Sequence, residues 1–284
     1  MKRFYAFFIL LSCLGCRHQP ILPEHPEDIV FLGHIYQSPD KIDPRLESTD
    51  YTRFGQVWLG GDICSETTEE ESTLDYLENI FSLSAPTTHW AVGNHDVRNG
   101  NLQWIEQATQ KPLFYSAHHD GLTLLVLNTS LQTEDCDARA RQYDLFTQLT
   151  DTISQSSHLV LMSHYIIWGD VVDGVEMRDQ ANANKPFWEA TCTPATQFPR
   201  SMYDQLKTVQ ARGVQVICLA GDFGQRVQSF SWQNPEGMWF LGAGFKKGNG
   251  IVADPEDQIL IFSHDVESRQ LDWRFTNVEE FLRY

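Results

Sequence analysis

The feature that most constrains the fold of this chain is a series of short apolar runs, each followed by a glycine or a polar side chain. Runs of this length, bounded by turn residues, are typical of strands buried in a sheet. Apolar residues at helical spacing separate several of the runs. We therefore predict strands over residues 28–33, 56–59, 87–92, 122–127, 157–162 and 214–220, and helices over residues 66–81, 142–153 and 201–211.

The order of these elements indicates the fold class. Strands alternate with helices in the first part of the chain, and short strands joined by Gly, Asn and Pro turns follow from residue 227 onward. This order favours an α/β (α+β) fold of two packed sheets with helices on their outer faces. With 284 residues, 42% of them hydrophobic, the chain has enough apolar side chains for one sizeable core. We expect one domain over residues 28–284.

Residues 1–16 have the features of an export signal. Lys2 and Arg3 precede an apolar run over residues 4–11, which is too short to span a bilayer but suits the core of a signal peptide. Leu10-Leu11-Ser12-Cys13 resembles a bacterial lipobox, with Cys13-Leu14-Gly15-Cys16 as the alternative. The resemblance implies cleavage before Cys13 or Cys16 and lipidation of its sulfur. A plain secretory signal is the competing interpretation.

Residues 17–27, which contain Pro20, Pro23 and Pro26, are predicted to be an extended tether between the lipid and the folded domain. We therefore expect a cell-envelope lipoprotein on the periplasmic side, held to the membrane by its N-terminal lipid. The residue after either candidate cysteine is not Asp, which by resemblance to enterobacterial sorting favours the outer membrane.

The net charge bears on possible partners, and the cysteine content bears on possible disulfides. The formal net charge of −17 argues against nucleic acid as a partner, because the phosphates would repel the chain. Cys136 and Cys192 lie in polar stretches and are predicted to pair as a disulfide in an oxidising compartment. Cys218 lies in an apolar run and is expected to be a buried thiol.

Residues able to bind a metal closely follow several of the predicted strands. The carboxyl ends of parallel strands meet at one edge of a sheet, so these side chains are expected to share a crevice. A carboxylate such as that of Asp62 can bridge two cations, and imidazole and amide oxygen ligands suit zinc, manganese or iron. The candidates are His34 with Tyr36, Asp62, Asn94 with His95, His164 and Asp222.

This chemistry suits a metal-assisted hydrolase. Two cations about 3.5–4 Å apart polarise a phosphoryl oxygen and supply a hydroxide nucleophile. A nearby histidine then protonates the leaving oxygen.

Three motifs resemble those of the calcineurin-like metallophosphoesterase family: Gly61-Asp62, Gly93-Asn94-His95-Asp96, and a strand that ends in His164. Their order and spacing match the family over residues 28 to 265. The resemblance implies a four-layer double β-sandwich flanked by helices. It also implies that Asp62 bridges the metals, that Asn94 and His164 bind the second metal, and that His95 is the catalytic acid. The substrate implied is a phosphate mono- or diester.

Two motifs depart from the family pattern. Where the family has Asp-x-His, this chain has His34-Ile35-Tyr36, and where it has Gly-His-x-His, this chain has Gly221-Asp222-Phe223-Gly224. One carboxylate and one imidazole have thus exchanged places, whereas Tyr36 is expected to pack or to donate a hydrogen bond. The predicted ligands of one or two divalent cations (Mn, Fe or Zn) are Asp62, Asn94, His164, Asp222 and His34.

The sequence supports an exported, lipid-anchored metallophosphoesterase first. The alternative is a catalytically inactive protein of the same fold that binds a ligand or partner at the cell envelope, because Gly224 offers no ligand. An envelope scaffold is a third interpretation. Outside the motifs, His118 and His119 are predicted to be solvated at a hairpin tip, and Lys246 and Lys247 to be a solvated pair.

Overall fold

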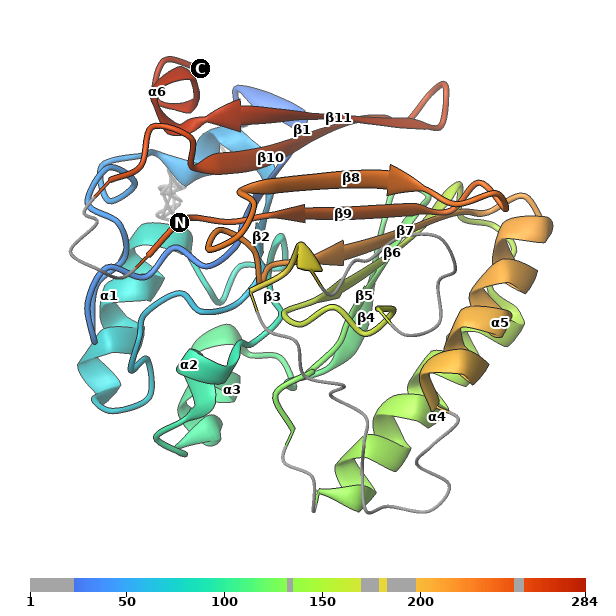
Figure 1. Cartoon of the computed structure of the whole chain (residues 1–284), viewed down its shortest axis with the longest axis horizontal. Coiled ribbons are helices and arrows are strands. Elements are labelled where there is room, and N and C mark those ends of the chain that lie inside the picture. The colour runs from blue at the N-terminus through green and yellow to red at the C-terminus, as the bar shows by residue number, and fades with distance from the viewer. Residues whose placement is uncertain (1–22, 132–134, 170–178, 183–197, 248–252) are drawn as a thin grey trace, which may run out of the picture.

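The computed structural model of the chain describes residues 23–131, 135–169, 179–182, 198–247 and 253–284 (Figure 1). Several predictions lie outside these residues, namely the signal segment with Cys13 and Cys16, residues 17–22 of the tether, and Cys192. None of the helices in the described part of the chain is both long and apolar enough to cross a membrane.

The described strands form two mixed sheets, which confirms the predicted α/β class. The first sheet has the order β11 (Gln270–Asn277), β10 (Gln258–Asp265), β1 (His25–Leu32), β2 (Phe54–Leu59) and β3 (Thr88–Trp90). The second has the order β4 (Tyr115–His119), β5 (Leu122–Val126), β6 (His158–Ser163), β7 (Gln215–Ala220), β9 (Trp239–Ala243) and β8 (Ser229–Gln233). Strands β1 to β3 pair in parallel, and so do β5, β6, β7 and β9.

The two sheets pack face to face, and the alternation of side chains along each strand fills the layers on both sides. In β1, Ile29 and Phe31 point to the apolar core shared by the sheets, whereas Val30 and Leu32 point to the opposite face. This is the period of two expected for a strand with both faces buried. Burial on both faces explains why the second half of β1, from Ile29 to Leu32, is an unbroken apolar run.

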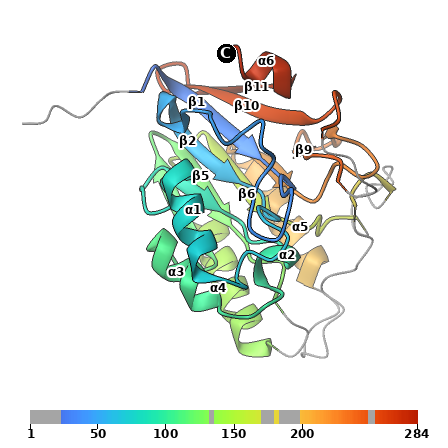
Figure 2. The same ribbon diagram turned by 90° about the vertical axis from the view of Figure 1, so that its left-hand side faces the viewer.

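Helices cover the outer faces. The first sheet is covered by α1 (Glu71–Phe81), α3 (Leu102–Thr109) and α6 (Val278–Phe281), and the second by α4 (Cys136–Thr152) and α5 (Phe198–Ala211). In both views α6 lies on the far side of the sheets from α4 (Figures 1 and 2). Two short helices remain: η1 (Tyr51–Arg53) directly precedes β2, and α2 (Asn94–Val97) follows β3. The order helix, sheet, sheet, helix is the predicted sandwich.

Glycines let the sheets approach closely where the parallel strands end. A Cβ on Gly221 would lie 2.0 Å from the carbonyl oxygen of Gly60, and a Cβ on Gly33 would lie 2.5 Å from that of Ala243. No side chain fits at such separations. The ends of β1, β2, β7 and β9 are therefore brought together at one edge of the sandwich.

Some boundaries differ from the predictions. β1 begins at His25, so residues 25–27 of the predicted tether are part of a strand. A register shift between His25 and Ile29 accommodates Pro26, which has no N–H for the ladder. The predicted strand over residues 87–92 is shortened to Thr88–Trp90, because the chain turns into the loop that carries Asn94.

The hairpin of β4 and β5 is present, but the predicted solvation of His119 is wrong. His119 is half-buried, and its Nε2 lies 3.0 Å from Nε2 of the buried His89 on β3. The predicted solvation of Lys247 is also wrong, since its Nζ is buried and donates to Asp43 at 2.7 Å. Both contacts come from segments distant in the sequence, which a local pattern does not report.

The prediction that Cys218 is a buried thiol is confirmed. Cys64 and Cys218 are buried free thiols, and burial raises the pKa of Cys218. Cys136 is disulfide-bonded. Its predicted partner, Cys192, lies outside the described residues.

Candidate metal centre

The loops at the carboxyl ends of the strands bring the predicted site residues together. His34 follows β1, Asp62 follows β2, Asn94 and His95 begin α2 after β3, His164 follows β6, and Asp222 follows β7. Ligand atoms of His34, Asp62 and Asp222 lie within 4.8 Å of one another. The carboxylate and the imidazole that exchanged places in the sequence, Asp222 and His34, are therefore neighbours in space.

Asp62 is the centre of the cluster, and its two carboxylate oxygens face different partners. Oδ1 lies 3.4 Å from Nε2 of His164 and accepts from the backbone N–H of His95 at 2.9 Å. Oδ2 lies 3.9 Å from Nε2 of His34 and 3.9 Å from Nε2 of His95. A carboxylate divided in this way is suited to bridge two positive centres.

The three histidines are held in the same manner. Nδ1 of His34 contacts the carbonyl of Phe245 at 2.8 Å, Nδ1 of His95 that of Ser65 at 3.1 Å, and Nδ1 of His164 that of Gly60 at 2.9 Å. A carbonyl oxygen only accepts, so Nδ1 carries the hydrogen in each ring. Each Nε2 is thereby turned toward Asp62, which is the arrangement that orients imidazoles for metal binding.

Acceptor atoms surround Nε2 of His164. They are Oδ1 of Asn94 at 3.3 Å, Oδ1 of Asp62 at 3.4 Å and Oδ1 of Asp222 at 4.0 Å. Burial alone would lower the pKa of His164, but the carboxylates of Asp62 and Asp222 outweigh it and raise the pKa to about 10. The pKa of Asp62 is lowered for the reciprocal reason, against its burial.

This donor set fits a divalent cation. The imidazole nitrogens, carboxylate oxygens and amide oxygen converge in a buried cluster that includes two carboxylates, where a positive centre is strongly favoured. His34, Asp62, His164 and Asp222 are all buried, so water competes weakly for the site. The structure therefore brings the residues predicted as ligands close together.

The backbone is held in an uncommon conformation at two of these residues. His34 has a φ of 53° and Asp62 a φ of 54°, in the left-handed region that residues with a Cβ seldom occupy. A Cβ on Gly93 would lie 2.2 Å from Oδ1 of Asp62, so that position requires glycine. Local strain of this kind persists where the surrounding structure fixes it, as at functional sites.

Asp96 joins the loop after β2 to the loop after β3, a role that was not predicted from the sequence. This fully buried carboxylate accepts the backbone N–H groups of Asp62 at 2.8 Å, Ile63 at 2.9 Å and Gly93 at 2.8 Å. The hydroxyl of Thr67 donates to it at 2.7 Å. It thereby ties the loop after β2 to the loop after β3 and fixes the position of Asp62.

Gly224 has no room for a side chain. Its φ is 121°, and a Cβ there would lie 2.1 Å from the carbonyl oxygen of Phe245. That same carbonyl accepts from His34. The carbonyl oxygen that leaves no room for a side chain at position 224 is therefore the same atom that orients His34.

Two tyrosines flank the cluster. The ring of Tyr36 stacks on His95 with centroids 4.7 Å apart and meets His34 edge-on at 4.9 Å, in line with the expectation that Tyr36 packs. The hydroxyl of Tyr165 donates to Oδ1 of Asn94 at 2.7 Å. Apart from its position next to His164, nothing in the sequence predicted a role for Tyr165.

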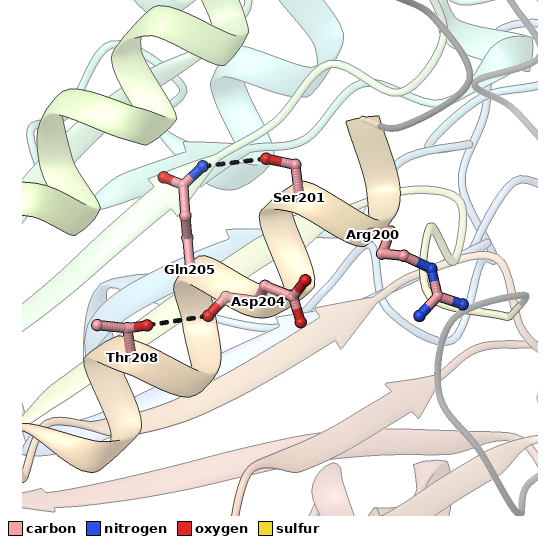
Figure 3. A pocket seen from close by; sticks show the side chains of 5 residues that line it. All are labelled: Arg200, Ser201, Asp204, Gln205 and Thr208. Carbon is pink, nitrogen blue, oxygen red and sulfur yellow. Dashed lines mark hydrogen bonds between the residues drawn. The ribbon is translucent and has the colours of Figure 1, made fainter.

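A separate hollow of about 440 Å³ lies on α5, away from these loops (Figure 3). It is lined by Arg200, Ser201, Asp204, Gln205 and Thr208. Asp204, the acidic side chain in this set, pairs with Lys207 at 2.7 Å. None of the candidate metal ligands lines this hollow.

Comparison with known proteins supports the fold. No family model matches the chain, and no curated protein matches its sequence. Among solved structures, the chain is similar to a dimetal phosphatase from Danio rerio, with a TM-score of 0.53 and 10% sequence identity. The match covers 90% of this chain and 97% of that chain. At this identity the likeness shows that the two proteins share a fold, an α/β sandwich of two mixed sheets.

Proposed function

We propose that this chain is a metal-dependent hydrolase of phosphate mono- or diesters, of the metallophosphoesterase type. The observation that carries the proposal is the convergence of the Nε2 atoms of His34, His95 and His164 on the carboxylate of Asp62. The shared fold with a dimetal phosphatase supports it.

Two overlapping sets of residues would hold the metal. Asp62, Asn94, His164 and Asp222 form one set, and His34 joins the two carboxylates in the other. Manganese, iron or zinc suits these ligands. Divalent cations in such a site polarise a phosphoryl oxygen and activate water as the nucleophile.

His95 would act as the general acid. Its side chain is 20% exposed, whereas that of His164 is 0% exposed, so His95 lies nearer the solvent. Because Ser65 holds the hydrogen on Nδ1, the transferable proton would be carried by Nε2 and given to the leaving oxygen. Stacking on Tyr36 keeps the plane of the imidazole fixed.

The chain is further proposed to act outside the cytoplasm. The basic start and the apolar run at the N-terminus, with a lipobox at Cys13 or Cys16, support lipid anchoring in the cell envelope on the periplasmic side, with the outer membrane favoured. Labelling of the expressed protein with a radioactive fatty acid tests this, and loss of label in a Cys13→Ala, Cys16→Ala double variant is expected.

The catalytic proposal is tested with nitrophenyl phosphate and bis-nitrophenyl phosphate, with manganese, zinc or iron added to metal-stripped protein. His95→Ala should lower turnover about 10²- to 10⁴-fold, the usual contribution of a general acid, while bound metal stays unchanged by elemental analysis. His164→Ala should lower both turnover and bound metal. His118→Ala, which alters an exposed histidine on β4, is the matched control.

Full activity of the His95→Ala variant on every substrate that the wild type cleaves would contradict the assigned acid. The second candidate function, an inactive protein that binds an envelope ligand, is favoured by the lack of room for a ligand at Gly224. Wild-type protein that binds metal but cleaves neither ester type would support this second function.

A further inference from the structure

We infer that Tyr165 is a positioning residue that fixes the amide of Asn94 with its oxygen toward the cation. The inference rests on the proposed metal centre. Asn94 is the amide in the ligand set, so no ion pair holds its side chain in one orientation. A side-chain amide presents either an oxygen or an NH2 group, and only the oxygen binds a metal ion.

The hydroxyl of Tyr165 selects the oxygen. It lies 2.7 Å from Oδ1 of Asn94, and Nε2 of His164 lies 3.3 Å from the same oxygen. Rotation of the amide by half a turn would place its NH2 group beside both, and would remove the oxygen from the cluster. An amide oxygen has two lone pairs, so it can accept from Tyr165 and still bind a cation.

Tyr165 is itself held firmly. Its backbone N–H donates to Oγ1 of Thr129 at 3.0 Å, and its carbonyl accepts from Oγ of Ser163 at 2.9 Å. The side chain is buried, and its ring lies 4.9 Å from that of His164. The hydroxyl is therefore placed by the rigid end of β6.

This hydrogen bond joins the two sheets at the site. Tyr165 and His164 follow β6 of the second sheet, whereas Asn94 and Asp62 follow strands of the first sheet. Adjacent residues of the chain thus supply one candidate ligand, His164, and the donor that orients another. Outer partners of this kind typically contribute about 10- to 100-fold to metal affinity.

The test compares two variants that each remove the hydroxyl of one buried tyrosine, one at the site and one away from it. Tyr165→Phe breaks the bond to Asn94. Tyr203→Phe is the matched control, because the Tyr203 hydroxyl is also bonded to an asparagine side chain, accepting from Nδ2 of Asn234 at 3.0 Å, but lies on α5, which carries none of the candidate ligands. Binding of Mn²⁺ to the intact protein is measured by titration calorimetry, and thermal unfolding shows that each variant is folded.

We expect Tyr165→Phe to raise the Kd for Mn²⁺ about tenfold, and Tyr203→Phe to leave it within about twofold. At saturating Mn²⁺ the kcat of Tyr165→Phe should return close to that of the wild type. An Asn94→Asp background provides a second measurement, because a carboxylate presents an oxygen in either orientation. In that background Tyr165→Phe should leave the Kd for Mn²⁺ unchanged.

Equal Mn²⁺ affinity of Tyr165→Phe and wild type would overturn this inference and leave the proposed hydrolase standing. Persistence of the tenfold loss in the Asn94→Asp background would also overturn it, since Tyr165 would then act on something other than the amide. Failure of the wild type to bind Mn²⁺ would overturn the proposed metal centre together with the inference.

Discussion

His89 is predicted to make the stability of this protein depend on pH between neutrality and pH 5. It lies on β3, at the edge of the first sheet, and its Nε2 is 3.0 Å from Nε2 of His119 on β4, at the edge of the second sheet. Its Nδ1 is 3.1 Å from the hydroxyl of Tyr115. One imidazole must donate to the other, so the bond between the sheet edges needs at least one ring neutral.

The magnitude follows from the pKa of His89. Burial first, and then the charges of His119 and Lys111, lower this pKa from 6.5 to about 3. His89 is therefore neutral in the folded protein, whereas the unfolded chain takes up a proton below about pH 6.5. The stability that depends on a neutral His89 is fully present above about pH 6.5. It is lost as the pH falls toward the pKa that His89 has in the folded protein. Proton linkage gives a loss of about 2 kcal/mol between pH 7 and pH 5.

Urea unfolding of the wild type and of His89→Gln at pH 7 and pH 5 measures this loss of unfolding free energy. Glutamine keeps hydrogen-bonding groups but does not titrate, so the variant should lose about 2 kcal/mol less than the wild type over this interval. The comparison is between two pH values within each protein, so the absolute stability of the variant does not matter. His118→Gln, at an exposed position, should behave as the wild type. An unchanged pH dependence in His89→Gln would refute the reasoning.

Two further predictions concern the site. Removal of divalent cations with a chelator should lower the free energy of unfolding, by about 2.7 kcal/mol relative to protein held at a hundredfold excess of Mn²⁺ over its Kd; a thermal melt that does not change with Mn²⁺ would contradict the metal centre. Gly224→Ala should destabilise the chain by about 1–3 kcal/mol more than Gly100→Ala. Both glycines have a positive φ, so the backbone strain of an alanine is similar at the two positions. A Cβ at position 224 would in addition meet the carbonyl oxygen of Phe245, whereas a Cβ at position 100 meets nothing within 4 Å. Chemical unfolding of both variants at neutral pH measures the difference.

The position of Asp96 changes how the Gly93-Asn94-His95-Asp96 motif is understood. Asn94 and His95 face the cluster, but Asp96 accepts the backbone N–H groups of Asp62, Ile63 and Gly93. The motif therefore combines groups that face the candidate metal centre with a carboxylate that holds the adjoining loops. A residue of this second kind is expected to affect stability and metal affinity together, because Asp62 would lose its fixed position without it.

The sequence by itself determined the sheets, the helices and the positions of the candidate ligands along the chain. Apolar runs such as Val30 to Leu32, and the helical spacing of Leu74 and Leu77, are local signals. Asp62 and His164 follow strands, and parallel strands place such residues at one edge whatever the details of packing. These features depend on periodicity and chain direction, which short stretches encode.

Only the tertiary structure decided the partners of those residues. The carbonyl that orients His34 belongs to Phe245, and the hydroxyl that holds Asn94 belongs to Tyr165. His119 is half-buried because it meets His89 across the sheet edges. Each of these contacts joins segments far apart in the chain, and each exists because two sheets pack closely at particular registers. Local patterns set which face of an element is apolar, but packing determines which distant atoms lie within hydrogen-bonding distance of one another.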